Sequence, residues 1–254
     1  MSSERPVAIV TGSSSGVGAA CVRQLSARGW NPVVNYSRSA AAAEEVAEAC
    51  RAAGADPLVF GADVSDDEAC RALVAAAVER FGRVDALVNN AGTTKFVNHA
   101  NLDGLDKEDF LHIYAVNTVG AYQMTRAAAA SLRAAGRASV VNVASIAGIR
   151  GIGSSIAYAA SKGALITMTK SLARVLGPEI RVNAVCPGFI QGDWLREGMG
   201  EETYDRTKAF LEQSTPLRTT ATADTVAESI VQLIEGASLV TGETLILDGG
   251  HHLL

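Results

Sequence analysis

The sequence predicts an α/β fold: a doubly wound, parallel, seven-stranded sheet with helices on both faces. Short apolar runs alternate with longer amphipathic segments along the 254 residues. The apolar runs are continuous stretches of Val, Ile and Leu, which is typical of parallel strands covered on both faces. The intervening segments are long enough for crossover helices, and right-handed crossovers place helices on the two faces of such a sheet.

The elements follow in order from this pattern. Strands are expected at 7–10, 32–35, 58–61, 86–88, 139–143, 181–185 and 244–247. Helices are expected at about 17–28, 40–53, 66–80, 107–134, 155–176 and 223–235. The run Ser65-Asp66-Asp67-Glu68 has the spacing of a capping box and predicts the start of the third helix. No long linker, low-complexity tract or repeat interrupts the pattern, so a single domain over 1–254 is expected.

Composition narrows the class of protein. Apolar residues make up 48% and charged residues 19%, as in soluble globular proteins. The net charge of −5 gives no electrostatic reason to expect nucleic acid as a partner. The start of the chain has no apolar segment long enough for a signal peptide or a membrane span, so a cytoplasmic protein is expected. Four scattered cysteines predict free buried thiols, and no His/Cys spacing predicts a metal site.

A glycine-rich turn follows the first strand directly and leads into a helix. Its sequence is Thr11-Gly12-Ser13-Ser14-Ser15-Gly16-Val17-Gly18. Glycine lets the backbone turn sharply and approach a ligand, and a helix N-terminus offers N–H groups to an anion. Many strand-to-helix turns contain glycine without binding anything. The position after the first strand of an alternating β/α chain nevertheless favours a dinucleotide site.

Tyr158 and Lys162 lie four residues apart in a helical segment, so their side chains share one helix face. A tyrosine titrates near pH 10 and exchanges protons poorly at neutral pH. A nearby cation favours the phenolate, and lowering the pKa of Tyr158 to roughly 7 needs about 4 kcal/mol. The pair alone is more often an ordinary surface contact. Its meaning depends on whether the chain binds a hydride carrier.

The motifs occur together in an order that identifies a family. They are the glycine turn, Asn89-Asn90-Ala91-Gly92, Asn117, Ser145, Tyr158-x-x-x-Lys162 and Pro187-Gly188. In this ordered set the chain resembles the short-chain dehydrogenase/reductase family over essentially its whole length. Within that family it is similar to the single-domain branch of β-ketoacyl-acyl-carrier-protein reductase. The resemblance implies a Rossmann fold and hydride transfer between a nicotinamide dinucleotide and a carbonyl or secondary alcohol.

The resemblance also implies roles for individual residues. Tyr158 would be the general acid/base, and Ser145 would hydrogen-bond the substrate oxygen. Lys162 would lower the pKa of Tyr158 and hold the nicotinamide ribose, while Asn117 would keep a water in a proton relay. Taken alone, Ser145 could equally cap a strand end and Asn117 could bend a helix. The residues implied at the cofactor are Gly12, Ser14, Ser15, Gly16, Val17, Gly18, Asp63, Val64, Asn90, Ala91, Gly92, Tyr158, Lys162, Pro187, Gly188 and Ile190.

The end of the second strand indicates which cofactor is used. NAD-dependent relatives usually have an acidic side chain there, which would repel a 2′-phosphate. This chain has Tyr36, Ser37 and Arg38, and the planar guanidinium of Arg38 suits a phosphate. NADP(H) is therefore expected over NAD(H), with a plain surface role for Arg38 as the alternative.

Substrate selection is expected in three segments: the glycine-rich loop before Tyr158, the loop 93–106, and a lid at about 188–213. The loop 93–106 carries Phe96, His99 and Leu102, and the lid carries Trp194. Such a lining favours an apolar carbonyl substrate, although core packing would account for these residues equally well. Many relatives have a threonine that bonds the carboxamide where this chain has Gly192, so a side-chain anchor is in doubt there.

Two helices rich in small apolar residues suggest a homo-oligomer, a tetramer or a dimer. One contains Ala127–Ala130, and the other contains Ile156, Ala160 and Ala164. A wide apolar helix surface favours a second copy of the chain. Alanine is also simply a good helix former, and the two interpretations have equal weight. An acyl carrier protein is a possible partner, for which Arg126 and Arg133 are the suggestive basic pair.

The expected function is an NADP(H)-dependent carbonyl reductase, with a 3-oxoacyl thioester as one candidate substrate. An NAD-linked alcohol dehydrogenase is the alternative among enzymes. A Rossmann protein that only senses nucleotides is a further alternative, because a fold alone does not define a function. That alternative is weakened by the presence of both Tyr158 and Lys162.

Overall fold

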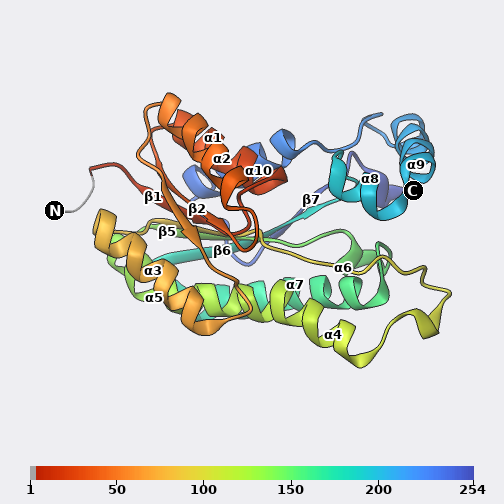
Figure 1. Ribbon diagram of the computed structural model, residues 1–254, viewed down its shortest axis with the longest axis horizontal. Helices are drawn as coiled ribbons and strands as arrows, with labels where there is room; N and C mark the ends of the chain where they lie inside the picture. The colour runs from red at the N-terminus through yellow and green to blue at the C-terminus, as the bar shows by residue number, and fades with distance from the viewer. Residues whose placement is uncertain (1–3) are drawn as a thin grey trace.

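Seven parallel strands form one sheet in the order β3-β2-β1-β4-β5-β6-β7 (Figure 1). The computed structural model describes residues 4–254, so the first three residues of the expected domain lie outside it. The strands are β1 (Val7–Val10), β2 (Asn31–Tyr36), β3 (Leu58–Gly61), β4 (Ala86–Asn89), β5 (Ala138–Val143), β6 (Ile180–Pro187) and β7 (Thr244–Leu247). The predicted fold class is confirmed, and each strand was predicted to within two residues at either end.

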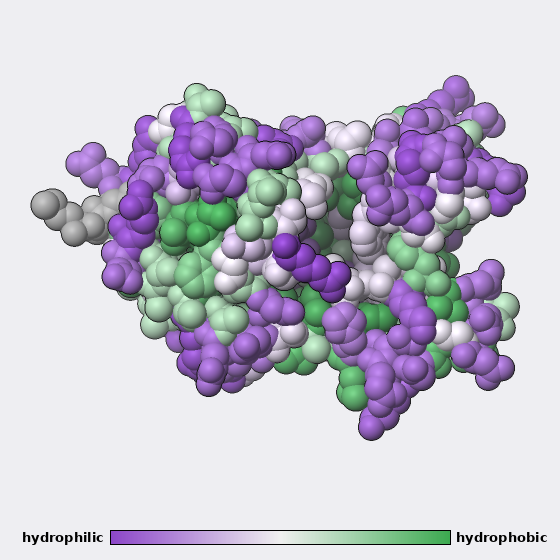
Figure 2. Space-filling model, viewed as in Figure 1, coloured by the Kyte–Doolittle hydropathy of each residue, from purple (hydrophilic) through white to green (hydrophobic). Residues whose placement is uncertain are grey.

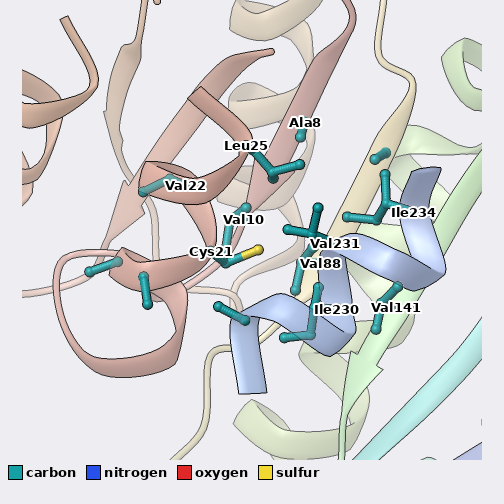
Figure 3. Packing of buried hydrophobic residues seen from close by; sticks show 14 of the residues in the cluster. Ala8, Val10, Cys21, Val22, Leu25, Val88, Val141, Ile230, Val231 and Ile234 are labelled. Carbon is teal, nitrogen blue, oxygen red and sulfur yellow. The ribbon is translucent and has the colours of Figure 1, made fainter. Parts of the chain in front are cut away.

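Helices cover the two faces of the sheet in two layers (Figure 1). One layer contains α1 (Gly16–Ala27), α2 (Ala40–Ala52) and α10 (Ala223–Glu235), whose apolar side chains pack on β1, β4 and β5. Figure 3 shows Cys21, Leu25 and Ile230 of this layer beside Val10 and Val88 of the strands. The other layer contains α3 (Asp67–Phe81), α5 (Ala121–Ala135) and α7 (Ile156–Leu176). Burial on both faces explains why the strands read as continuous apolar runs.

The third helix begins differently from the expectation, because Asp66 and not Ser65 is its N-cap. The Asp66 carboxylate accepts from the Glu68 and Ala69 N–H groups. Ser65 instead donates from its N–H and its hydroxyl to the Asp63 carboxylate. Ser and Asp are both good N-caps, so adjacent candidates leave the first residue ambiguous in sequence.

The helix expected at 107–134 is not continuous. It consists of α4 (Lys107–Tyr114), a π-helical turn at Ala115–Gly120 and α5. The Asn117 amide lies in that turn, where it donates to the Thr93 carbonyl and the Ser161 hydroxyl and accepts from the Thr93 N–H. These bonds hold the widened turn against the start of the loop 93–106 and against α7. Such π-turns are common at functional sites.

Short helices gather at the end of the molecule beyond the strand carboxyl ends. They are α6 (Ala147–Arg150), α8 (Asp193–Met199) and α9 (Glu201–Ser214), drawn at the right of Figure 1. The expected lid therefore consists largely of two helices rather than an irregular loop. All four cysteines are free and buried, as predicted. Within residues 4–254, no helix combines the length and the apolar character needed to cross a membrane.

Candidate active site

The site lies where the sheet order reverses. The chain proceeds from β1 outward to β2 and β3, then returns to β4 beside β1 and continues the other way. Ligands of open α/β sheets bind at such a switch point, beyond the strand carboxyl ends. Figure 2 shows the surface hollowed beside this region, between the α8–α9 part of the molecule and the main body.

The glycine turn after β1 packs against the segment after β4. The Asn90 amide donates to the Thr11 and Gly12 carbonyls, and the Thr11 hydroxyl accepts from the Asn90 and Ala91 N–H groups. A Cβ on Gly18 would lie 2.6 Å from the Asn90 amide nitrogen and the Gly12 carbonyl. Only glycine fits at position 18, as expected, and Asn90 is the partner that makes the turn tight.

Asn35 supports the same turn and was missed at the sequence level. Its side-chain oxygen accepts from the Gly12 N–H, and its amide donates to the carbonyls of Tyr36, Phe60 and Ala62. The side chain is fully buried at the end of β2. The sequence signal for this role was a polar residue inside an otherwise apolar strand. A buried amide in such a place usually hydrogen-bonds backbone groups.

The first turn of α1 is suited to an anion. Gly12 and Gly16 have φ values of 60° and 54°, which bend the turn around to the helix start. Ser15 is the N-cap, yet its side chain does not bond the helix N–H groups. An uncapped N-terminus presents N–H groups and the positive end of the helix dipole. Together with Ser14 and Val17 in the same turn, these residues fit the pyrophosphate of a dinucleotide.

The segment after β2 leaves a guanidinium available. The Tyr36 ring lies across Gly61 of β3, since a Cβ on Gly61 would approach its hydroxyl to 3.0 Å. Ser37 and Arg38 are exposed. Among residues 4–254, Arg38 has no hydrogen-bond or ion-pair partner, so its guanidinium is available to a phosphate.

Asp63 and Val64 follow β3. Hydrogen bonds from the N–H and hydroxyl of Ser65 lower the pKa of Asp63, so its carboxylate is already engaged within its own turn. Val64 is buried, and its carbonyl accepts from the Gln123 side chain. The structure places both residues at the same edge of the sheet as the glycine turn.

Tyr158 and Ser145 come together at the carboxyl ends of β5 and β6. Ser145 follows β5 by two residues, and its hydroxyl accepts from the Ala147 N–H at the start of α6. Tyr158 lies in the first turn of α7, where its N–H donates to the N-cap Ser155. Burial raises the pKa of Tyr158 to about 12, and the Ser145 hydroxyl opposes this rise only in part.

Lys162 is buried one helical turn further along α7, and only 3% of it is exposed. Its ammonium donates to the Val143 carbonyl at 2.8 Å and lies 5.7 Å from the centroid of the Tyr158 ring. Burial lowers the pKa of Lys162 to about 8. The expected lowering of the Tyr158 pKa by Lys162 is wrong for the protein by itself, because desolvation is the larger effect at the buried phenol.

Gly92 and Asn117 complete this side of the site. A Cβ on Gly92 would lie 3.4 Å from the Asn117 side-chain oxygen and 3.6 Å from the Lys162 ammonium. The structure thus brings Asn117, from the π-turn, close to Lys162. A side chain at position 92 would therefore contact both polar groups.

The segment after β6 closes the other side. The Gly188 N–H donates to the Leu247 carbonyl, and a Cβ on Gly188 would lie 2.7 Å from that of Asp248. Ile190 forms an isolated bridge with Ala221, made by the neighbouring groups of Phe189 and Gln191. The Ile190 N–H takes no part in that bridge. With Pro187 at the end of β6, this segment lies beside Ser145, whose hydroxyl is 3.5 Å from the Pro187 carbonyl.

Gly192 has a backbone that a threonine would not readily adopt. Its φ is 149° and its ψ is 172°, a region populated essentially by glycine. Its N–H donates to the hydroxyl of Tyr204, which is buried against Phe189. The backbone conformation at position 192 therefore favours glycine over the threonine that many relatives have there.

Two aromatic residues of the expected substrate segments reach Tyr158. Trp194 of α8 lies 6.1 Å from the Tyr158 ring and 5.6 Å from the Phe96 ring, measured between centroids. Leu102 is 75% exposed, so it is neither core nor an enclosed lining residue. The His99 Nε2 atom is buried without a hydrogen-bond partner among residues 4–254.

Comparisons with known proteins find relatives over nearly the whole chain. A family model described as enoyl-(acyl carrier protein) reductase matches residues 12–252. The chain is 44% identical over 251 residues to "Granaticin polyketide synthase putative ketoacyl reductase 2" of Streptomyces violaceoruber, covering 99% of this chain and 98% of that protein. It is 38% identical over 249 residues to L-rhamnose 1-dehydrogenase (NAD(P)(+)) of Azotobacter vinelandii, covering 95% and 94%.

A solved structure resembles the whole chain. It is that of "a putative short-chain dehydrogenase/reductase from Burkholderia xenovorans", with 40% sequence identity and a TM-score of 0.92. The match covers 99% of this chain and 100% of that one.

Proposed function

Because this chain belongs to the short-chain dehydrogenase/reductase family, we propose that it transfers a hydride between NADP(H) and a carbonyl or secondary alcohol. One observation carries the proposal: the Tyr158 phenol, the Ser145 hydroxyl and the Lys162 ammonium meet beside the glycine turn. We further propose that residues 1–254 act as a single domain and that residues 188–213 form its lid.

The chain's own residues move the proton. The nicotinamide would supply or accept the hydride. In reduction, the Tyr158 hydroxyl donates a proton to the substrate oxygen, and the Ser145 hydroxyl bonds the same oxygen. A pKa of about 12 keeps the phenol protonated at neutral pH, which suits a proton donor. Both hydrogen bonds strengthen as negative charge develops on the oxygen, so they favour the transition state over the bound ketone.

Lys162 and Asn117 support the proton donor. With a pKa of about 8, Lys162 is charged at neutral pH. Because this pKa is close to neutral, the ammonium can give up and regain a proton readily. A charged ammonium makes the phenolate that remains after proton transfer less costly. We propose that Lys162 also holds the nicotinamide ribose. Asn117 orders the π-turn close to Lys162. In that position it would keep the relay water in place.

The cofactor is held from the glycine turn to the β6 segment. We assign the pyrophosphate to Gly12, Gly16 and Gly18 and to the N–H groups of the first turn of α1. Asp63, Val64 and Asn90 would hold the adenine half. Ala91, Gly92, Pro187, Gly188 and the N–H of Ile190 would hold the nicotinamide half.

Replacing Arg38 by Ala tests the preference for NADP(H). The exposed guanidinium has no partner in the described part of the chain, and a bidentate charge-assisted bond to a 2′-phosphate contributes about 1.5–3 kcal/mol. NADPH binding is therefore expected to weaken about 10- to 100-fold while NADH binding is unchanged, measured by fluorescence titration. Arg51→Ala is the matched surface control, because Arg51 pairs with Glu44 and Glu48 on α2. Equal losses for the two cofactors would show that Arg38 does not read the phosphate.

A second candidate is reduction of a 3-oxoacyl thioester, which the name of the ketoacyl reductase relative favours. The basic pair expected to meet an acyl carrier protein is weakened as a docking site, because Arg126 is bound to Asp67 and lies over the Tyr122 ring. A substrate panel separates the candidates. Simple ketones, secondary alcohols, a 3-oxoacyl thioester and an enoyl thioester are offered with NADPH or NADH. If the protein turned over no member of this panel, the proposed function would be contradicted.

We also propose that the protein is a homo-oligomer, a dimer or a tetramer. Leu111, Val119, Ile156 and Val175 are exposed apolar residues on α4, α7 and the π-turn. Association of these surfaces would remove them from water. Light scattering at micromolar concentration is expected to report a multiple of 26.3 kDa, and a monomer there would rule the assembly out.

A further inference from the structure

Three aromatic rings form a row that starts at the proposed proton donor. The Tyr158 ring is followed by Trp194 at 6.1 Å and then by Phe96 at 5.6 Å from Trp194. The contacts are tilted or edge-on, the geometries that aromatic pairs prefer. Half of the Trp194 surface is nevertheless exposed, at 51%. A large apolar side chain beside the reacting hydroxyl therefore keeps ring surface that a ligand can cover.

The outer end of this row is firmly supported. A Cβ on Gly198 would lie 2.0 Å from the Phe96 ring, so α8 and Phe96 are in direct contact. The segment that carries Phe96 is tied to the loop before α7 by two bonds, from the Val97 N–H to the Ser154 carbonyl and between the Thr94 and Ser154 hydroxyls. The row is thus held at both ends, by Ser154 at Phe96 and by α7 at Tyr158.

Charges near the row are already paired. Lys95, next to Phe96, binds the Asp109 carboxylate at 2.6 Å. Arg196, in the same helix as Trp194, binds Glu201 and lies over the Tyr204 ring. These cations are therefore committed to partners in their own chain. A neutral substrate suits this environment better than a carboxylate or phosphate, for which neither Lys95 nor Arg196 is unpaired.

We propose that Trp194 and Phe96 select substrates whose carbonyl carbon carries a planar unsaturated group, such as an aryl ketone. The inference rests on the proposed function, since the Tyr158 hydroxyl defines where the carbonyl oxygen lies. A flat ring attached to that carbonyl stacks on the neighbouring Trp194 indole, and Phe96 limits its thickness. A saturated ring of the same size is thicker and lacks the π-face, so it gains less from the same contact.

Two ketones of matched size test the proposal. Acetophenone and cyclohexyl methyl ketone differ mainly in whether the ring is flat and unsaturated. The ratio of kcat/KM for the aryl ketone to that for the cyclohexyl ketone is measured in the wild type and in Trp194→Leu, Trp194→Phe and Phe96→Leu. Comparing this ratio between variants cancels the difference in intrinsic reactivity of the two ketones. Trp30→Leu is the matched control, because Trp30 precedes β2 at the opposite edge of the sheet and bonds Glu235.

Trp194→Leu and Phe96→Leu are each expected to lower the ratio about fivefold, the effect of one aromatic contact of about 1 kcal/mol at 1.4 kcal/mol per tenfold. Trp194→Phe keeps a ring and should retain most of the ratio, and Trp30→Leu should leave it unchanged. Turnover of both ketones with an unchanged ratio in the first two variants would overturn the inference alone. If the wild type turned over other members of the substrate panel but neither of these two ketones, the inference alone would be overturned. If it turned over no member of the panel with either cofactor, the proposed function would be overturned, and the inference with it.

Discussion

Tyr158→Phe is expected to lower kcat for ketone reduction about 1,000-fold while leaving NADPH affinity nearly unchanged. The substitution removes only the hydroxyl, so the ring keeps its contacts with Trp194 and the Lys162 ammonium. Without the hydroxyl no group donates a proton to the substrate oxygen, and general acid catalysis typically contributes about 10²- to 10⁴-fold. Single-turnover kinetics with NADPH and fluorescence titration of the cofactor measure the two quantities separately.

Tyr122→Phe is the matched control. Tyr122 is exposed on α5 and its ring lies under Arg126, so loss of its hydroxyl touches nothing in the site. Activity of that variant is expected to equal the wild type. Retention of more than about a tenth of the activity by Tyr158→Phe would reject the proton-donor role, since general acid–base catalysis typically contributes about 100-fold or more.

Lys162→Met is expected to reduce kcat about 100-fold and at the same time to change how stability depends on pH. The activity falls because the buried ammonium no longer stabilises charge at Tyr158. The stability effect follows from the pKa of Lys162, which is about 8 in the folded protein against 10.5 for an ordinary lysine. Between these values the unfolded chain binds more protons, so the free energy of unfolding rises with pH through this window. Burial of the charged Lys162 therefore lowers the free energy of unfolding by its full amount below about pH 8. Above about pH 10.5 the lysine is neutral in both states and this cost is absent.

The variant lacks this titration. The free energy of unfolding of the wild type, relative to Lys162→Met, should increase by on the order of 2 kcal/mol between pH 7 and pH 10. Urea unfolding at the two pH values measures it, with Lys170→Met as control because Lys170 is an exposed lysine on the same helix. An identical pH dependence in the wild type and Lys162→Met would mean that Lys162 titrates as a solvated lysine.

The strands and most helices were predictable because their signals are local. Each strand is a continuous apolar run, and each long helix is an amphipathic one. The spacing of the glycines predicts the tight turn between the first strand and the first helix. A bend at Asn117 was one of two interpretations of the sequence. The break at 115–120 did not follow from it, because the break depends on hydrogen bonds from Asn117 to Thr93 and Ser161, which are distant in sequence. The cap at Asp66 was missed for a smaller reason, since Ser65 and Asp66 are equally good caps in sequence.

The residues of the candidate site were predictable by their order, but their electrostatics were not. The spacing of Tyr158 and Lys162 indicates a shared helix face, and from this a lowered pKa of the phenol was expected. Burial has the opposite effect on the phenol, and spacing carries no information about how much water a fold excludes. Asn35 was overlooked for a related reason, since Gly12, Phe60 and Ala62 become its neighbours only when β1, β2 and β3 pair.

Ser154 links the loop 93–106 to the start of α7. It holds the Phe96 segment through its carbonyl and its hydroxyl, and the next residue caps the helix that carries Tyr158. A change in the loop 93–106 is therefore expected to disturb the alignment of Tyr158, the proposed proton donor, as well. Mutations in the two loops should show epistasis, and laboratory evolution toward new ketones should recover activity through paired changes around Ser154 rather than through single ones.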